Sequence, residues 1–133
     1  NLGKIYRDLG EIQRAIELYE QEITIAREVG DRAGEGEAWG NLGIAYGTLG
    51  ENRRAIEFFE QSLTIAREIG DRSGEGNASW NLGLSLVNEG DLGRAVDLMQ
   101  ILVDYMREIG HSDTEKCADD VEFLRVRIAE QKS

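Results

Sequence analysis

The chain has 133 residues, a formal net charge of −11 at neutral pH and a single cysteine. Nucleic acid and anionic membranes attract basic surfaces, so this charge argues against both kinds of partner. One cysteine excludes an intrachain disulfide and favours a reducing, cytoplasmic setting. No apolar run approaches the ~20 residues that span a membrane. We therefore expect a cytoplasmic protein that binds neither nucleic acid nor membrane.

The sequence repeats with a period of forty residues. Segments 1–40, 41–80 and 81–120 each begin with Asn-Leu-Gly; the first two are identical at 25 of 40 aligned positions, and the third matches the second at 12. A fixed period of this length is typical of stacked helical repeats, in which each unit packs against its neighbours. The period therefore predicts an all-α repeat fold and a protein that acts through its surfaces.

Glycines mark the ends of the predicted helices. One set precedes an acidic residue that would open the next helix, as at Gly10, Gly50 and Gly90; a second set closes the longer helix of each unit. The helices predicted in chain order are 1–9 (a remnant), 11–29, 32–49, 51–69, 72–89, 91–109 and 113–131.

The longer helix of each unit carries an apolar stripe. Its members recur at three- and four-residue steps, with charged residues on the opposite side, which is typical of an amphipathic helix that buries one face. In unit two the stripe is Ala55, Ile56, Phe59, Leu63 and Ala66, and in unit one it is Ala15, Ile16, Tyr19, Ile23 and Ala26.

The last predicted helix is expected to cover the open end of the stack, where an apolar face would otherwise meet water. Ser112 and Glu115 have the spacing of a capping box. The apolar stripe of this helix is Ala118, Val121, Leu124 and Ile128. We thus expect a single repeat domain over 1–133, divided into repeat 1 (1–30, with a truncated first helix), repeat 2 (31–70), repeat 3 (71–110) and a cap helix (111–133).

The residues of unit two resemble the tetratricopeptide repeat (TPR) family. The matching positions are Trp39, Leu42-Gly43, Tyr46, Ala55 and Phe59 in unit two, Leu2-Gly3, Tyr6, Ala15 and Tyr19 in unit one, and Leu82-Gly83 and Ala95 in unit three. The forty-residue period and the phrase at 66–76 resemble the long-repeat branch, which includes the LGN/Pins polarity adaptors and bacterial signalling proteins. At the family's second small-residue position stand Glu22, Ser62 and Leu102, which predicts looser packing between adjacent helices there.

The resemblance implies a right-handed superhelical stack of antiparallel helix pairs, an α-solenoid. It also implies a non-catalytic scaffold, without a cofactor, whose concave groove binds a protein or peptide partner. Asn1, Asn41 and Asn81 recur at a position that faces this groove in the family. A carboxamide both donates to and accepts from a peptide backbone, so these residues suit an extended ligand; the alternative is that they satisfy neighbouring helix backbone or water. The other groove positions that the resemblance implies are Lys4, Arg7, Asp8, Glu37, Gly40, Ile44, Gly47, Thr48, Asn77, Trp80, Leu84, Val87 and Asn88.

Trp80 is the most specific of these candidates. The family's tryptophan position holds Ser79 in unit three, and the tryptophan stands one residue later. One residue is ~100° around a helix, enough to turn the indole from the packed interface toward the concave face. Tryptophan in such a groove is enriched among binding hot spots. The alternative is that Trp80 fills space against the cap helix.

No motif predicts catalysis, a cofactor or a metal site. The string at 34–37 lacks the third glycine and the preceding strand of a dinucleotide loop, and it recurs at 74–76, so close helix approach explains it better. Asp31, Glu35 and Glu37 lack the spacing of a calcium loop and are expected to form a solvated acidic first turn. His111 and Cys117 are each unique in the chain and are not expected to form a catalytic pair.

Two functions fit these observations. The first is a peptide-binding interaction module, formed by the last repeats of a larger signalling or regulatory protein, because the chain begins within a repeat. The second is self-association or an intramolecular docking arm without a peptide ligand, which includes a homodimer through the incomplete first repeat.

Overall fold

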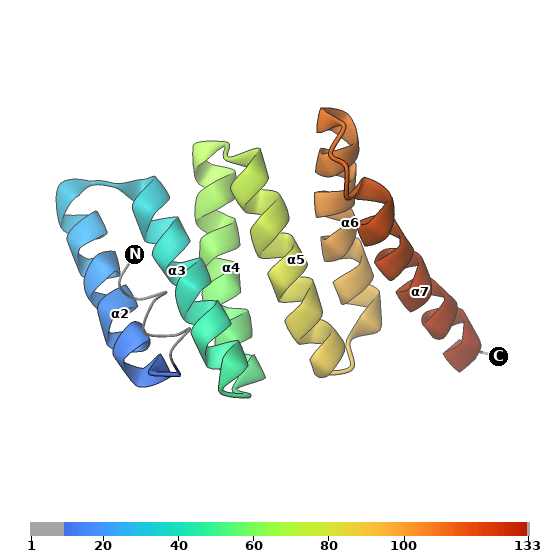
Figure 1. Cartoon of the computed structure of the whole chain (residues 1–133), viewed down its shortest axis with the longest axis horizontal. Coiled ribbons are helices and arrows are strands. Elements are labelled where there is room, and N and C mark those ends of the chain that lie inside the picture. Colours follow the sequence, from blue (N-terminus) through green and yellow to red (C-terminus); the bar gives the residue numbers. More distant parts are fainter. Residues whose placement is uncertain (1–9, 133) are drawn as a thin grey trace.

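The computed structural model of the chain describes residues 10–132. This part consists of six helices without a strand: α2 (Ile12–Val29), α3 (Arg32–Thr48), α4 (Asn52–Ile69), α5 (Arg72–Asn88), α6 (Leu92–Ile109) and α7 (Thr114–Lys132). The helices follow one another in a row, and each runs antiparallel to the one before it (Figure 1). The predicted all-α repeat fold is confirmed. The helix predicted over 1–9 lies outside the described residues.

Left-handed glycines end α2, α4 and α6. Gly30, Gly70 and Gly110 have φ values of 75°, 71° and 68°, a region that glycine enters without the steric cost other residues meet. Each glycine donates its N–H to a carbonyl of the last helical turn, at 3.3 Å. The recurrence of this geometry every forty residues fixes the direction in which the next helix leaves.

Aspartate side chains cap the N-termini of α3, α5 and α6, whereas glutamate at the equivalent place before α2 and α4 does not. The carboxylates of Asp31, Asp71 and Asp91 accept a backbone N–H three residues on, at 2.9, 2.9 and 3.3 Å. Glu11 and Glu51 occupy the same place before α2 and α4, but their side chains make no capping hydrogen bond. The additional methylene group makes glutamate a poor match for this short-range bond, for which Asp, Asn, Ser and Thr are preferred.

The capping box predicted at the start of the last helix is not formed. The helix begins at Thr114, so Ser112 lies one residue too early to cap it. The N–H of Asp113 donates instead to Nδ1 of His111 at 3.0 Å, and Glu115 pairs with Arg107 at 3.8 Å.

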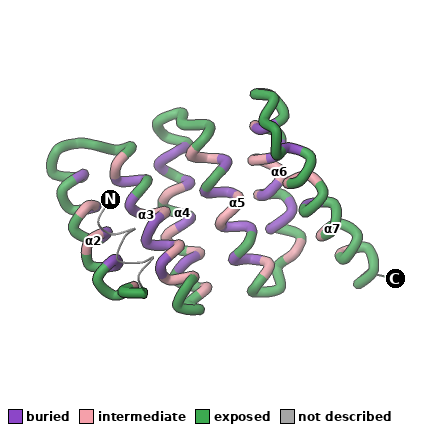
Figure 2. Tube along the Cα trace, in the orientation of Figure 1, coloured by how far each residue is buried: buried purple, intermediate pink, exposed green. Residues whose placement is uncertain are grey.

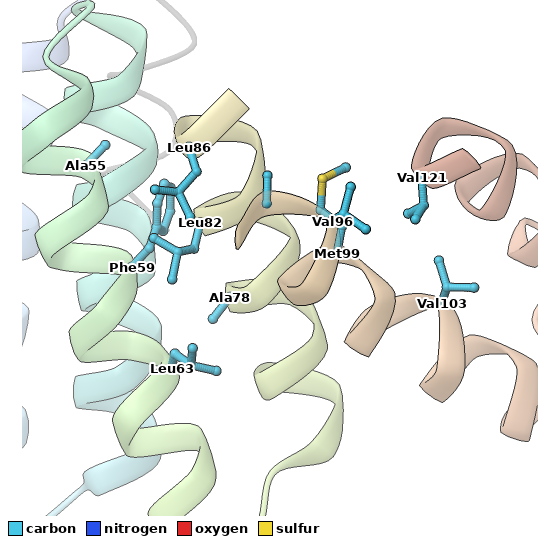
Figure 3. Packing of buried hydrophobic residues seen from close by; sticks show 11 residues of the cluster. Ala55, Phe59, Leu63, Ala78, Leu82, Leu86, Val96, Met99, Val103 and Val121 are labelled. Atoms are coloured by element: carbon cyan, nitrogen blue, oxygen red, sulfur yellow. The ribbon is translucent and has the colours of Figure 1, made fainter. Parts of the chain in front are cut away.

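Figure 2 marks the buried residues along the row of helices. Their side chains form two clusters. The first, between α2 and α3, contains Ala15, Ile16, Tyr19, Ile23, Ala38, Leu42 and Ala45. The second, from α4 to α7, contains Ala55, Phe59, Leu63, Ala78, Leu82, Leu86, Ala95, Val96, Met99, Val103 and Val121 (Figure 3). Nearly all members of the two predicted apolar stripes are buried; only Ile56 is partly exposed. The stripe predicted for α7 packs against the second cluster through Val121, with Ala118, Leu124 and Ile128 partly buried around it.

Glycines within helices allow neighbouring helices to approach closely. A Cβ atom on Gly43 would lie 2.5 Å from Cε1 of Phe59, and one on Gly36 would lie 2.9 Å from Cγ2 of Ile65. Glu22, Ser62 and Leu102, which stand at the position predicted to pack more loosely, all line surface hollows between the helices. Hypothetical Cβ atoms on Gly40 and Gly76 would lie 3.3 Å from Oγ of Ser62 and 2.9 Å from Cδ1 of Leu102. The missing side chain on the facing helix provides the space that the larger residue occupies.

Glu35 is not the solvated residue that the sequence predicted. It is 4% exposed and accepts hydrogen bonds from Arg32 at 2.9 Å, Arg27 at 3.1 Å and Trp39 at 3.2 Å. Burial on its own raises the pKa of this carboxyl, but the three hydrogen bonds outweigh it and hold the pKa below the usual value for glutamate. Glu35 therefore ties α2 to α3 as an ionised group.

Candidate functional site

A hollow of about 530 Å³ opens between α3, α4 and α5. This volume lies within the range of ~300–1,000 Å³ found for ligand clefts. Helix α3 lines it with Ala33, Gly36, Glu37, Gly40, Asn41 and Ile44; α4 lines it with Phe59, Ser62, Ile65, Ala66 and Ile69; α5 and its N-terminal turn contribute Asp71, Ser73, Gly74, Asn77, Ala78, Trp80 and Asn81; and Leu102 comes from α6. Residues from repeats 2 and 3 thus share one concave surface.

Seven of the residues predicted for the groove line this hollow: Glu37, Gly40, Asn41, Ile44, Asn77, Trp80 and Asn81. Five others do not: Gly47, Thr48, Leu84, Val87 and Asn88. They lie nearer the C-terminal ends of α3 and α5 than the residues that line the hollow. Asn1, Lys4, Arg7 and Asp8 lie outside the described residues.

Asn41 presents a buried hydrogen-bond donor. The residue is 6% exposed, and its Nδ2 has no hydrogen-bond partner within residues 10–132. A buried amide left in this state costs ~1–3 kcal/mol. Because Nδ2 itself is closed off from solvent, an acceptor in the hollow reaches it after the Asn41 side chain turns. The alternative prediction, that the recurring asparagines satisfy neighbouring helix backbone, does not hold for the Nδ2 of Asn41 within residues 10–132. Asn81, its counterpart forty residues on, is partly buried and lines the same hollow.

The two tryptophans have different surroundings. Trp39 stacks on Phe58 with ring centroids 5.5 Å apart, donates to Glu35, and has the guanidinium of Arg27 5.6 Å from its ring. Trp80 is partly buried at the edge of the second cluster and lines the hollow. Ser79 takes the place equivalent to Trp39 and is fully buried. The shift of one residue therefore brings the second indole to the concave surface.

Sequence reasoning missed the contribution of α4 and of the turn after it. Ser62, Ile65, Ile69 and Asp71 were not among the predicted groove residues, because only the first helix of each unit was considered. One signal could have found Ile69. Apolar residues recur at 29, 69 and 109, outside the buried stripe, and all three are exposed.

No metal centre is assembled in the described part of the chain. No group of three or more His, Cys, Asp or Glu side chains in residues 10–132 is placed to hold a metal ion. Burial raises the pKa of the Cys117 thiol, and the charges of Asp120 and Asp113 raise it further, so the thiol stays protonated at neutral pH. None of the described helices has the length and apolar character needed to cross a membrane.

Comparison with solved structures finds the same arrangement of helices. A putative kinesin light chain from Podospora anserina, with nearly identical TPR-like repeats, has a TM-score of 0.78 at 20% identity, over 92% of this chain and 62% of that one. The TPR domain of Arabidopsis FLU has a TM-score of 0.75 at 21% identity, over 80% and 90%. BtubC from P. vanneervenii has a TM-score of 0.64 at 20% identity, over 96% and 62%. The chain thus spans about three-fifths of the kinesin light chain structure, and these likenesses concern the fold alone.

Comparison of sequences agrees with the structural result. No curated protein matches the chain. The profile of the tetratricopeptide repeat family matches residues 1–68, which include repeats 1 and 2 except for the last two residues of the second. The comparisons do not separate the long-repeat branch from the rest of the family. Because the profile matches more than half of the chain, and the chain folds as a stack of antiparallel helices, the chain belongs to the tetratricopeptide repeat family.

Proposed function

We propose that the hollow between α3, α4 and α5 binds an extended peptide segment or a partner helix of another protein, and that the chain acts as a non-catalytic scaffold. Tetratricopeptide repeats generally mediate protein–protein interaction. The observation that supports a site at this place is one hollow lined by Trp80 and by the side-chain amides of Asn41, Asn77 and Asn81. The single cysteine supports a cytoplasmic setting.

The lining residues suit a peptide in two ways. Trp80, Ile44 and Leu102 offer an apolar surface for one inserted side chain. The amide of Asn41 can donate to a peptide carbonyl, and the amides of Asn77 and Asn81 can both donate and accept. Backbone contacts of this kind hold an extended chain with little dependence on its sequence, and the apolar pocket adds a preference for one side chain.

A pair of tryptophan variants tests the site. The probe is a peptide selected on the intact chain from a random display library. We expect Trp80→Ala to weaken its binding by tenfold or more, because hot-spot residues contribute ~2 kcal/mol or more and each ~1.4 kcal/mol is tenfold in affinity. We expect Trp39→Ala to lower the melting temperature more than Trp80→Ala, because Trp39 stacks on Phe58 and donates to Glu35.

Two results would contradict the proposal. If Trp80→Ala unfolds the protein as badly as Trp39→Ala, then Trp80 belongs to the core and the pocket loses its anchor. If sedimentation at increasing concentration shows assembly, and peptide binding is absent, then self-association is the better function. Self-association through the first repeat would involve residues 1–9, which lie outside the described part of the chain.

A further inference from the structure

A second hollow, of about 280 Å³, lies between α2 and α3. It is lined by Glu22, Ile25, Ala26, Val29, Asp31, Gly34, Glu37 and Ala38. Adding forty to each number gives Ser62, Ile65, Ala66, Ile69, Asp71, Gly74, Asn77 and Ala78, and all eight of these line the larger hollow. The two hollows are therefore the same feature in successive repeats. Glu37 lines both of them and marks where they adjoin.

The charges along this double groove have one sign. The ionisable residues that line it are Glu22, Asp31, Glu37 and Asp71, and no Lys, Arg or His of the described chain is among the lining residues. Nearby arginines are engaged elsewhere. Arg27 pairs with Glu35 at 3.1 Å, and Arg32 pairs with both Glu35 and Glu68. Asp31 and Asp71 cap helices, whereas Glu37 is exposed and lies where the two hollows adjoin, on a chain whose net charge is −11.

Apolar side chains stand beside these carboxylates in both hollows. Val29 is 72% exposed and Ile25 58% exposed in the smaller hollow, and Ile69 is 42% exposed in the larger. The larger hollow adds Trp80 and the unpartnered amide of Asn41. A ligand that fits both hollows needs positive charge near the carboxylates and apolar side chains between them.

We infer that the occupant of the groove is an extended segment of another protein that places a lysine or arginine at Glu37 and a large apolar side chain against Trp80. This inference rests on the proposed function and specifies its ligand. Charge complementarity of this kind speeds association and rejects ligands of the wrong sign. Because the field of the whole chain is negative, it adds to the rejection of acidic segments. Asn41 would donate to a backbone carbonyl of the same segment.

The test is a selection of random twelve-residue peptides displayed against the intact chain, repeated with variants. We expect peptides rich in Lys or Arg and large apolar residues, and poor in Asp and Glu. Glu37→Gln should weaken a selected peptide about two- to fivefold, as expected for one exposed ion pair of up to ~1 kcal/mol. Glu37→Lys should shift the selection toward acidic peptides. Glu57→Lys, on the exposed side of α4 and outside both hollows, makes the same change in net charge and should leave the selection unchanged.

The outcomes separate this inference from the proposed function. Peptides that require Trp80 but carry no positive charge would overturn the inference and leave the peptide-binding function standing. If no selected peptide depends on Trp80, both fail. An equal shift with Glu57→Lys would assign the preference to net charge and not to Glu37. If the selected sequences match a segment of this chain, the occupant is a second copy.

Discussion

Gly43 shows how strongly one missing side chain controls the approach of two helices. A Cβ atom there would lie 2.5 Å from the ring of Phe59, which is itself 4% exposed and cannot move aside freely. We expect Gly43→Ala to lower the free energy of unfolding by ~1–3 kcal/mol through overpacking, although alanine favours the helix by ~1 kcal/mol. Urea denaturation measures the change.

Gly47, one turn later in α3, is the matched control. A Cβ atom there would make only an ordinary contact, 3.8 Å from Cβ of Ala55. Gly47→Ala should leave the free energy of unfolding unchanged or raise it by up to ~1 kcal/mol. A gain in stability from Gly43→Ala, equal to that from Gly47→Ala, would show that α3 and α4 can separate at no cost.

Glu35 predicts a dependence of stability on pH. Its pKa is lower in the folded chain than the usual value, so folding favours the ionised form. The resulting stabilisation is fully present above the pKa of the unfolded state and is lost as the pH falls through the lowered folded value. Glu35→Gln should therefore be less stable than wild type at neutral pH, by ~1–3 kcal/mol, since it removes a buried, charge-assisted acceptor. The difference between the two proteins should shrink in acid.

Thermal unfolding from neutral pH to acid measures this difference. Glu75→Gln is the control, because Glu75 stands at the equivalent position but its side chain is 28% exposed and it pairs with Arg67 at 3.1 Å. It should cost less, and its effect should depend less on pH. A Glu35→Gln variant that stays as stable as wild type at neutral pH would exclude the ionised network as a source of stability.

At the scale of the helices, the period and the glycines predicted most of what the structure shows. The predicted and observed ends of the helices agree within one or two residues. This is because the glycines that adopt a left-handed conformation at these ends can be recognised in the sequence. Glu35 was not predictable in the same way. Glu35 is held in its buried position by hydrogen bonds from Arg27 and Arg32, which lie on either side of a turn, and from Trp39. Unit three has Ser79 in place of Trp39, and there the equivalent Glu75 is more exposed.

The position of α7 follows the same register. Its Glu115 pairs with Arg107 as Glu35 pairs with Arg27, so α7 takes the place of the first helix of a further unit. Four glycines of α3 lie close to α4: Gly36, Gly40, Gly43 and Gly47. Their counterparts in α7 are Lys116, Asp120, Phe123 and Arg127. The side of α7 that would receive a further helix therefore carries large and charged side chains, and the guanidinium of Arg127 lies 5.9 Å from the ring of Phe123. No helix can approach this side as closely as α4 approaches α3.

At the scale of the whole molecule, the two buried clusters suggest that stability is regional. Among residues 10–132, Tyr46 alone is a partly buried residue that packs against both clusters. In a linear array, the loss of a contact acts mainly on neighbouring units. A change in α7 should therefore affect α6 and α5 first and reach the α2–α3 cluster last, across the interface between α3 and α4.

A pair of valine variants in α7 tests this view and the role of α7 as a cap. Val121 is 1% exposed and packs against the second cluster, whereas Val126 is 48% exposed on the same helix. We expect Val121→Ala to lower the free energy of unfolding by ~1–3 kcal/mol and Val126→Ala to leave it nearly unchanged. Hydrogen exchange followed by mass spectrometry should show the loss of protection in α6 and α7, with α2 and α3 little affected.

Deletion of 112–133 would expose the same face completely and should cause aggregation. If Val126→Ala is as costly as Val121→Ala, α7 does not pack as described; if protection falls equally in all helices, the array unfolds as one cooperative unit and Tyr46 couples its two clusters tightly.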